Sequence, residues 1–326
     1  MTAPAVTVLV TSYNYGRYVG AAMESVRAQT ADNFECVVID DGSTDNSLSV
    51  IGSFLSDPRF RLVRQQNRGV SHARNVGIGL ANAPYIAFLD ADDLWRPTKL
   101  ERQLERFRDR PDLGVVFTRR TIIDSDDGPR PCSDVLPPEG RVVGPLFRQN
   151  FVCFSSAMVR TEAAVRVGGF DERLGLAVDY DFWLRVARHY PFGVVDEPLV
   201  AYRVGHGVNL SRRQRERYHV ALYVMRRFER HFDAAAARLS PAEVARAEAE
   251  TFANLGVLCR GFSRRTAAAW LLRAVRADPA LLAAWRGLAA AAVPAAVRRL
   301  VRWLRGASGD WERQCYSQFN RPEAVL

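Results

Sequence analysis

Residues 85–93 are YIAFLDADD, a short apolar run that passes directly into a cluster of carboxyl groups. The run Tyr85–Leu89 has the length of a buried strand. Asp90 and Asp92 follow it two residues apart, where both can converge on a hard divalent cation such as Mg²⁺ or Mn²⁺. The alternative is an acidic turn that caps the next helix, because Asp is also a favoured N-cap residue.

Outward from this segment, apolar runs alternate with helical patterns. The strands are expected at Val6–Val10, Phe34–Ile39, Phe60–Val63, Tyr85–Leu89 and Leu113–Thr118. The helices between them are expected at Gly16–Ala28, Asp45–Leu55, Ser71–Leu80 and Arg96–Arg108. This alternation predicts an α/β fold with a doubly wound, mostly parallel sheet and helices on both faces. Such sheets bind their ligands at the carboxyl ends of the strands, where the acidic residues lie.

The rest of the chain divides into three parts. Residues 120–150 are rich in Pro, Gly and Asp, which predicts a surface excursion. Regular structure is expected again from 151. Its elements are a helix at Asp179–His189 and two strands, Phe192–Val195 and Leu199–Val204. Beyond 211 the pattern is helical. We therefore expect a catalytic domain at 1–211 and a basic α-helical extension at 212–326.

Three further polar segments have the composition of ligand contacts. Strand one ends in Thr11, Tyr13 and Asn14, where a tyrosine ring can stack on a base and the other two offer polar contacts. Packing is the more common role of a buried tyrosine.

Asp40 and Asp41 follow strand two, where their carboxylates can accept hydrogen bonds from a base or a ribose, and Gly42 permits a tight turn. A simple turn is the alternative. Arg74 lies in the first turns of a helix and can reach a phosphate with a bidentate fork.

Together these segments resemble the family 2 glycosyltransferases of GT-A fold. The motifs are VTVLVTSYN, VVIDDGSTDNS, NRGVSHARNVG and YIAFLDADD, and SSAMVRTEAAVRVGGFDERLGLAVDYDFWLRVA resembles the acceptor-side half of the family. The resemblance covers about residues 5–211. It implies an inverting enzyme that transfers a sugar from a nucleotide diphosphate-sugar, UDP- or dTDP-type, to the hydroxyl of a glycan or lipid-linked acceptor with Mn²⁺ or Mg²⁺.

The resemblance also implies roles for single residues. The residues that would bind the nucleotide-sugar are Thr11, Tyr13, Asn14, Asp40, Asp41, Arg74, Asp90 and His206. Asp92 would be the more direct metal ligand, and His206 would contact the metal or the diphosphate. The usual Glu-Asp pair that supplies the base is Val178-Asp179 here, so Asp179 is the expected catalytic base and Asp181 its rival. The helix N-cap is the other role open to Asp179.

Composition and charge limit the remaining classes. The net charge of +9 is uneven, since residues 1–211 carry −2 and residues 212–326 carry +11. In Ala296–Arg305, arginines share one face and apolar side chains the other, so we expect a possible peripheral contact of 280–305 with the inner membrane face. A helix packed on the catalytic domain is the alternative.

With no apolar run of 18 residues, no signal-peptide pattern and five scattered cysteines, a cytoplasmic location is expected.

Three other classes are less compatible with the sequence. No complete G-x-G-x-x-G follows a strand, as a dinucleotide-binding dehydrogenase requires, and no aromatic-basic module indicates nucleic-acid binding. A nucleotidyltransferase needs a Gly-rich basic loop after strand one, where this chain has Ser12-Tyr13-Asn14-Tyr15. A non-catalytic nucleotide-sugar binder or scaffold stays open, because Val178 replaces an acid of the usual pair.

Overall fold

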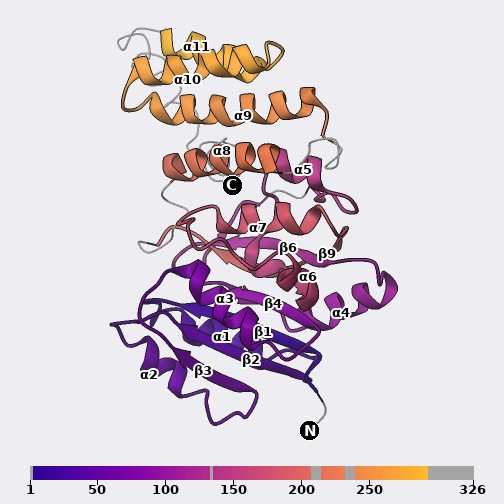
Figure 1. The fold of residues 1–326 in the computed structure, drawn as a ribbon. Helices are drawn as coiled ribbons and strands as arrows, with labels where there is room; N and C mark the ends of the chain where they lie inside the picture. Colours follow the sequence, from indigo (N-terminus) through magenta and orange to yellow (C-terminus); the bar gives the residue numbers. More distant parts are fainter. Residues whose placement is uncertain (1–2, 133–134, 207–213, 232–238, 293–326) are drawn as a thin grey trace. The chain divides into compact units, whose positions relative to one another are not determined.

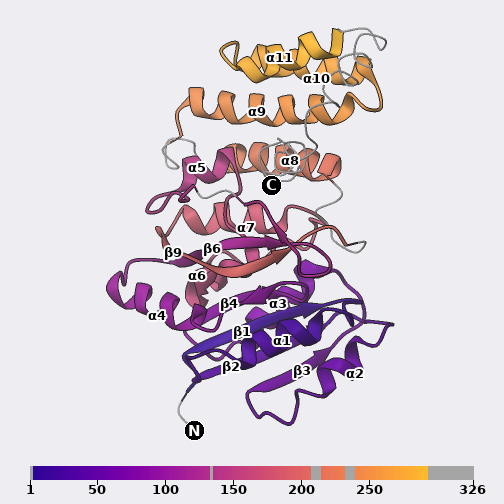
Figure 2. The same ribbon diagram turned by 180° about the vertical axis from the view of Figure 1, so that it is seen from behind.

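A computed structural model of the chain describes residues 3–132, 135–206, 214–231 and 239–292. The chain forms two compact units: Met1–Val142 with Val152–Asn209, and Val143–Phe151 with Leu210–Leu326. The first is an α/β unit and the second is helical in its described part (Figure 1). Figure 2 shows the same elements from behind.

The first unit contains one sheet of nine strands. They are β1 (Val6–Ser12), β2 (Phe34–Asp40), β3 (Phe60–Arg64), β4 (Tyr85–Asp90), β5 (Leu94–Trp95), β6 (Val115–Ile123), β7 (Pro129–Arg130), β8 (Met158–Arg160) and β9 (Phe192–Arg203). Their order is β3-β2-β1-β4-β8-β6-β9-β5, with β7 beside β6. Strands β1 to β4 pair in parallel, and β6 pairs in parallel with β9. The predicted α/β fold is therefore confirmed.

The second half of the sheet differs from the expectation in two details. The short strand β8 runs antiparallel between β4 and β6, and β5 runs antiparallel to β9. The two strands expected at 192–204 are one strand, β9, whose register with β6 shifts between Thr118 and Arg120. A bulge bends a strand without ending it, which explains the interruption in its apolar pattern.

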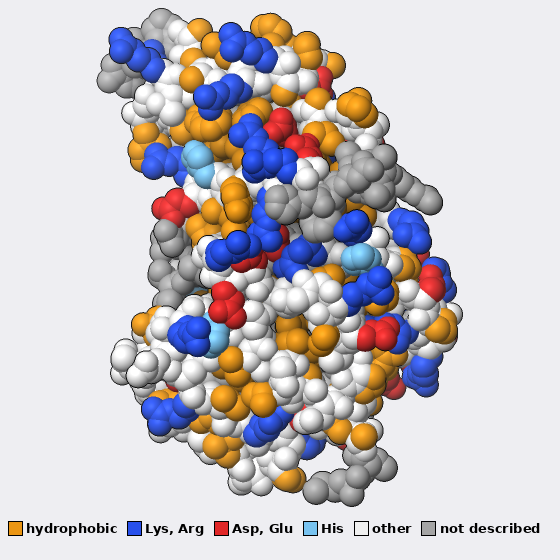
Figure 3. All heavy atoms as spheres, in the orientation of Figure 1, with side chains coloured by type: hydrophobic (Ala, Val, Ile, Leu, Met, Phe, Trp, Pro, Cys, Tyr) orange, Lys and Arg blue, Asp and Glu red, His pale blue; other side chains and the backbone are white. Residues whose placement is uncertain are grey.

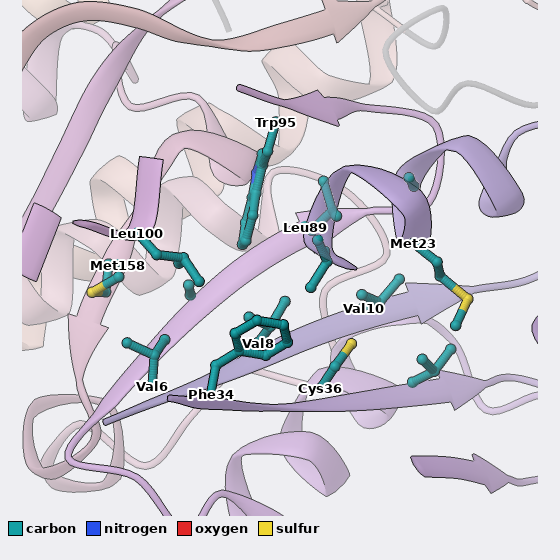
Figure 4. Packing of buried hydrophobic residues seen from close by; sticks show 14 of the residues in the cluster. Val6, Val8, Val10, Met23, Phe34, Cys36, Leu89, Trp95, Leu100 and Met158 are labelled. Atoms are coloured by element: carbon teal, nitrogen blue, oxygen red, sulfur yellow. The ribbon is translucent and has the colours of Figure 1, made fainter. Parts of the chain in front are cut away.

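Helices cover both faces of the sheet because alternate residues of β1 point to opposite sides. Val6, Val8 and Val10 pack with α1 (Val19–Arg27) and α4 (Lys99–Asp109) in one core, part of which is shown in Figure 4. On the other side Leu9 packs against α3 (Val70–Leu80). A Cβ on Gly77 would lie 2.1 Å from a Leu9 methyl carbon, so the missing side chain lets α3 approach the sheet.

The face of the sheet that carries α3 also holds an aromatic core. Phe88 of β4 stacks on Phe154 with a centroid distance of 4.7 Å, and Phe170 stacks on Phe182 of α7 (Val178–Ala187) at 4.2 Å. Smaller elements complete the unit: α2 (Ser47–Gly52), the 3₁₀ turn η1 (Phe154–Ser156) and α6 (Thr161–Arg166). The aromatic core ties η1, α7 and the loop that carries Phe170 to β4, and so brings three distant segments to the end of that strand.

The second unit is built from helices α5 (Val143–Arg148), α8 (Gln214–His231), α9 (Pro241–Cys259), α10 (Arg264–Ala277) and α11 (Leu282–Ala292). The buried Leu271 of α10 is wedged between Gly256 of α9 and Gly287 of α11. A Cβ on either glycine would lie 2.5 Å from a Leu271 carbon. Ser240 and Glu243 form a reciprocal capping box at the start of α9.

Part of the expected surface excursion at 120–150 is ordered core. Strand β6 continues to Ile123, and α5 buries Val143, Leu146 and Phe147 within the second unit. The surrounding Pro, Gly and Asp residues hid these short apolar segments from a pattern search.

The expected membrane-binding helix at 280–305 is described only as α11, which ends at Ala292, and residues 293–305 lie outside the described residues. Among the described helices, none combines the length and apolar character that a bilayer crossing requires.

Candidate active site

The functional side chains lie at the carboxyl edge of the parallel strands. In the sheet register Thr11 pairs with Ile39 of β2 and with Asp90 of β4, and Ser12 pairs with Asp40. The first three predicted segments therefore meet at one edge, as the parallel topology requires.

The turn Asp90–Asp93 is the centre of this edge. Asp92 is 7% exposed, and one of its carboxylate oxygens lies 2.7 Å from Nε2 of His206, a residue 114 positions further along the chain. His206 is 6% exposed, and its Nδ1 has no hydrogen-bond partner among the described residues. The structure thus brings together the two residues that were predicted to contact a metal.

The carboxyl groups of this turn repel one another. Burial, and then the charge of Asp92 and that of Asp90, raise the pKa of Asp93 well above its ordinary value. Burial also raises the pKa of Asp90, to which Asp92 and Asp179 add, while Arg74 opposes the increase. A cation bound at this turn would relieve the repulsion, because opposite charge favours the ionised form of a carboxyl group.

Arg74 binds the carboxylate of Asp90 directly. Its Nη2 donates to Asp90 Oδ1 at 2.8 Å, and its guanidinium lies 3.6 Å from the centroid of the Phe154 ring. The arginine is 6% exposed, and its Nε has no partner among the described residues. Arg74 is therefore held rigidly beside Asp90, and one buried donor is left for a ligand.

Asp41 and Asn14 have structural contacts that the sequence did not indicate. Asp41 accepts hydrogen bonds from the backbone N–H of Arg68 and of Gly69, both at 2.9 Å, and so fixes the loop before α3. Asn14, with a φ of 58°, accepts from the backbone N–H of Thr44 at 2.8 Å and thereby holds the loop after β2.

Asp40 and Tyr13 retain groups for a ligand. Asp40 is fully buried and accepts from the Ser43 N–H through Oδ1, but its Oδ2 has no partner among the described residues. The Tyr13 side chain is 40% exposed. Gly42 has a φ of 82°, and a Cβ there would lie 2.9 Å from the backbone nitrogen of Asn67, so the turn after β2 requires glycine.

Helix α7 distinguishes the two candidate bases. Asp181 is buried and forms an ion pair with Arg185 at 2.7 Å, one turn further along the helix. Asp179 is half-buried in the first turn and is close enough to Asp90 to raise the pKa of that carboxyl. Asp181 is thus bound in a structural pair, whereas Asp179 lies toward the carboxylate edge.

Several residues of the site were not among those predicted from the sequence. The rings of Tyr15 and Tyr18 contact the His206 ring, with centroid distances of 5.8 and 5.0 Å. Burial and the three aspartates of the turn raise the pKa of the Tyr15 hydroxyl far above its ordinary value. Ser155 and Arg203 also contact this turn. Because these residues are brought in by η1, β9 and the loop after β1, only the folded chain reveals them.

The donor set is compatible with a hard divalent cation. Carboxylate oxygens with an imidazole nitrogen suit Mn²⁺, and Mg²⁺ in enzymes is commonly held by one or two carboxylates together with substrate phosphates. Within the described ranges, no three His, Cys, Asp or Glu side chains converge as a complete protein-only site. Asp92 and His206 would therefore supply part of the coordination, and the substrate and water the rest.

Comparison with known proteins finds a family match for the first unit. Residues 7–168 match the model of glycosyl transferase family 2. Chondroitin synthase of Escherichia coli is 30% identical over 219 residues, which are 64% of this chain and 30% of the relative. Hyaluronan synthase of Pasteurella multocida is 30% identical over 212 residues, which are 64% of this chain and 21% of the relative. The chain therefore spans less than a third of the length of these two synthases.

Solved structures share the fold. A mannosyltransferase from Pyrobaculum calidifontis, in complex with GDP-Man and Mn²⁺, superposes with a TM-score of 0.66 at 21% identity, covering 99% of this chain and 86% of that one. S. aureus TarS 1–349 in complex with UDP-GlcNAc gives a TM-score of 0.56 at 16% identity, covering 92% of each chain. With the family match over residues 7–168 and the four motifs at one sheet edge, the chain belongs to glycosyl transferase family 2.

Proposed function

We propose that the first unit transfers a sugar from a nucleotide diphosphate-sugar to an acceptor hydroxyl with inversion at the anomeric carbon. The observation that carries the proposal is the contact of 2.7 Å between Asp92 and His206 beside the Asp90–Arg74 pair, because it gathers acidic, imidazole and guanidinium groups at one strand end. Groups of this kind suit a sugar diphosphate and its counter-ion.

Each residue has a role in the proposed reaction. Asp179 takes the proton of the acceptor hydroxyl while the hydroxyl oxygen attacks the anomeric carbon. The bond from that carbon to the diphosphate oxygen breaks on the opposite face. Asp90 orients the donor sugar, and Arg74 faces the developing charge on the phosphate. A divalent cation held by Asp92 and His206 would neutralise the diphosphate leaving group. The pairing of Asp181 with Arg185 supports Asp179 as the base.

The donor and acceptor are proposed by class. UDP- or dTDP-sugars are the first donors to test, and GDP-sugars follow because a structural neighbour binds GDP-Man. The relatives that make chondroitin and hyaluronan support a glycan acceptor in polysaccharide or glycolipid synthesis.

A donor screen tests the proposal. Purified protein with Mn²⁺ or Mg²⁺ is titrated with UDP-, dTDP- and GDP-sugars, and thermal shift and donor hydrolysis are followed. We expect one nucleotide class to raise the melting temperature only when metal is present. No response to any donor would favour the alternative of a non-catalytic binder or scaffold, which the replacement of an acid by Val178 keeps open.

We also propose a peripheral contact of the second unit with an anionic membrane. The exposed side chains of α11 include Leu282 (66% exposed) and Trp285 (49% exposed), with Arg286 beside them. Apolar and aromatic side chains next to arginine suit the headgroup boundary of a bilayer. Hydrophobic and basic side chains both appear on the face of this unit that Figure 3 displays.

Vesicle sedimentation tests the membrane contact. The double variant Leu282→Glu/Trp285→Glu should lose association with phosphatidylglycerol vesicles, whereas Phe262→Glu, at a side chain 80% exposed outside α11, should retain it. Equal binding of both variants would refute a contact through α11.

A further inference from the structure

We propose that Asp93, the third carboxyl group of the Asp90–Asp93 turn, is a positioning residue that fixes the turn against η1 and the end of β9, so that Asp92 and His206 meet. The inference rests on the proposed metal-dependent function. It assigns Asp93 no contact with the metal or the sugar.

The first connection runs through Ser155 of η1. The backbone N–H of Asp90 donates to the Ser155 hydroxyl oxygen at 3.0 Å, and the same hydroxyl donates to Asp93 Oδ2 at 2.5 Å. The Ser155 hydroxyl has one proton and donates it to Asp93, while the hydroxyl oxygen accepts from the Asp90 N–H. One serine therefore closes both ends of the turn, and it lies on a segment more than 60 residues away in sequence.

The second connection runs to the end of β9. The backbone N–H of Arg203 donates to Asp93 Oδ1 at 2.8 Å, and Arg203 Nε donates to the carbonyl oxygen of Asp92 at 2.7 Å. Arg203 is only 2% exposed. Because His206 follows three residues later, these two bonds set the distance between the turn and the histidine.

The contacts of the three aspartates separate their roles. Asp93 is 1% exposed, and each of its oxygens accepts from a protein donor. The side chain of Asp90 is 31% exposed and reaches the open edge. Asp92 contacts His206. A buried carboxyl group with both oxygens occupied suits orientation of its neighbours rather than ligand binding.

Side chains of other elements hold the backbone of η1 by hydrogen bonds. Trp95 Nε1 donates to the carbonyl oxygen of Ser155 at 2.8 Å, and Gln103 Nε2 donates to that of Ser156 at 2.9 Å. Gln103 Oε1 also accepts from Nζ of the buried Lys99 at 2.7 Å. This network fixes the backbone of η1, so the Ser155 hydroxyl has a defined position against which Asp93 is held.

Binding of Mn²⁺, measured by the loss of the free-ion electron paramagnetic resonance signal, tests the inference. Titrations are made on the full chain with Mn²⁺ alone, with saturating UDP and with saturating GDP. Ser155→Ala and Asp93→Asn should each weaken Mn²⁺ binding by about tenfold, the usual effect of removing a partner that orients a metal ligand.

Ser156→Ala is the matched control. Ser156 is equally buried in the same turn, but its hydroxyl donates to the Cys153 carbonyl and not to a carboxylate. We expect this variant to bind Mn²⁺ like the wild type even if its melting temperature falls as much as that of Ser155→Ala. A parallel fall in stability without a parallel fall in Mn²⁺ affinity separates positioning from a general loss of structure.

Two outcomes contradict the inference in different ways. If Ser155→Ala binds Mn²⁺ as tightly as the wild type, the positioning role is wrong and the proposed metal site stands. If the wild type itself binds no Mn²⁺ under any of the three conditions, the metal-dependent function fails and the inference fails with it. Should Asp93→Asn not fold, Ser155→Ala still decides.

Discussion

The turn Asp90–Asp93 of the first unit and Asp278 of the second unit use acidic side chains in opposite ways. In the turn Asp90–Asp93 of the first unit, burial and then the charges of neighbouring carboxyl groups raise the pKa values of Asp90 and Asp93. In the second unit Asp278 accepts from Arg246 at 2.7 Å, and that hydrogen bond is the main reason that its pKa is lowered. Clustered like charges cost folding stability and indicate a binding site, whereas a paired surface charge is a small structural contribution.

The largest expected loss of activity follows from substitution in the turn Asp90–Asp93. Asp92→Ala should reduce sugar transfer by roughly three orders of magnitude, since stabilising the leaving diphosphate through the metal is worth several kcal/mol. Metal-dependent binding of the nucleotide should also be lost in calorimetric titrations. Asp278→Ala, the control in the second unit, should leave both unchanged. A variant at Asp92 with normal turnover would remove the basis for the proposed site.

The next effect separates the two aspartates of α7. Asp179→Asn should reduce transfer by about 10²- to 10⁴-fold and leave donor binding intact, as expected for a general base. Asp181→Asn should instead destabilise the fold by about 3–5 kcal/mol, because it removes the negative charge that pairs with the largely buried Arg185. Steady-state kinetics and urea unfolding of both variants decide the assignment, and a normal kcat in Asp179→Asn would contradict it.

The third expected effect is a loss of stability when packing in the second unit is disturbed. Leu271→Ala should lower the free energy of unfolding by about 2–5 kcal/mol, because Gly256 and Gly287 leave no side chains to fill the cavity. Leu272→Ala, at the neighbouring side chain that is 48% exposed, should change it by less than about 0.5 kcal/mol. Denaturant unfolding measures both. Equal effects would mean that α10 does not pack as described.

The smallest effect is a pH dependence of stability. A carboxyl group whose pKa is raised by folding binds more protons in the folded state, so its contribution favours the folded state as pH falls toward its ordinary value near about 4. Relative to wild type, Asp90→Asn should therefore be most favourable near neutral pH and lose that advantage on acidification. Urea unfolding across this range measures the difference, and a constant difference would show that Asp90 does not titrate abnormally.

Much of the first unit could be predicted because its signals are local. Tyr85–Asp90 is a strand in the structure as expected, and the strand–helix alternation implies that Asp40 and Asp90 lie at one edge. The antiparallel strand β8 has three residues, too few for a periodic pattern. The contribution of Ser155 was missed for the same reason, since η1 is also three residues long.

The sequence by itself determined the alternation of strands and helices, the acidic and glycine residues at the strand ends, and hence the family and the location of the site. Only the tertiary structure decided that His206 meets Asp92 and that Asp41 and Asn14 hold loops. The physical reason is that periodicity and turn chemistry depend on near neighbours in the chain. Hydrogen bonds between residues 27 to 114 positions apart depend on how distant segments of the chain pack together.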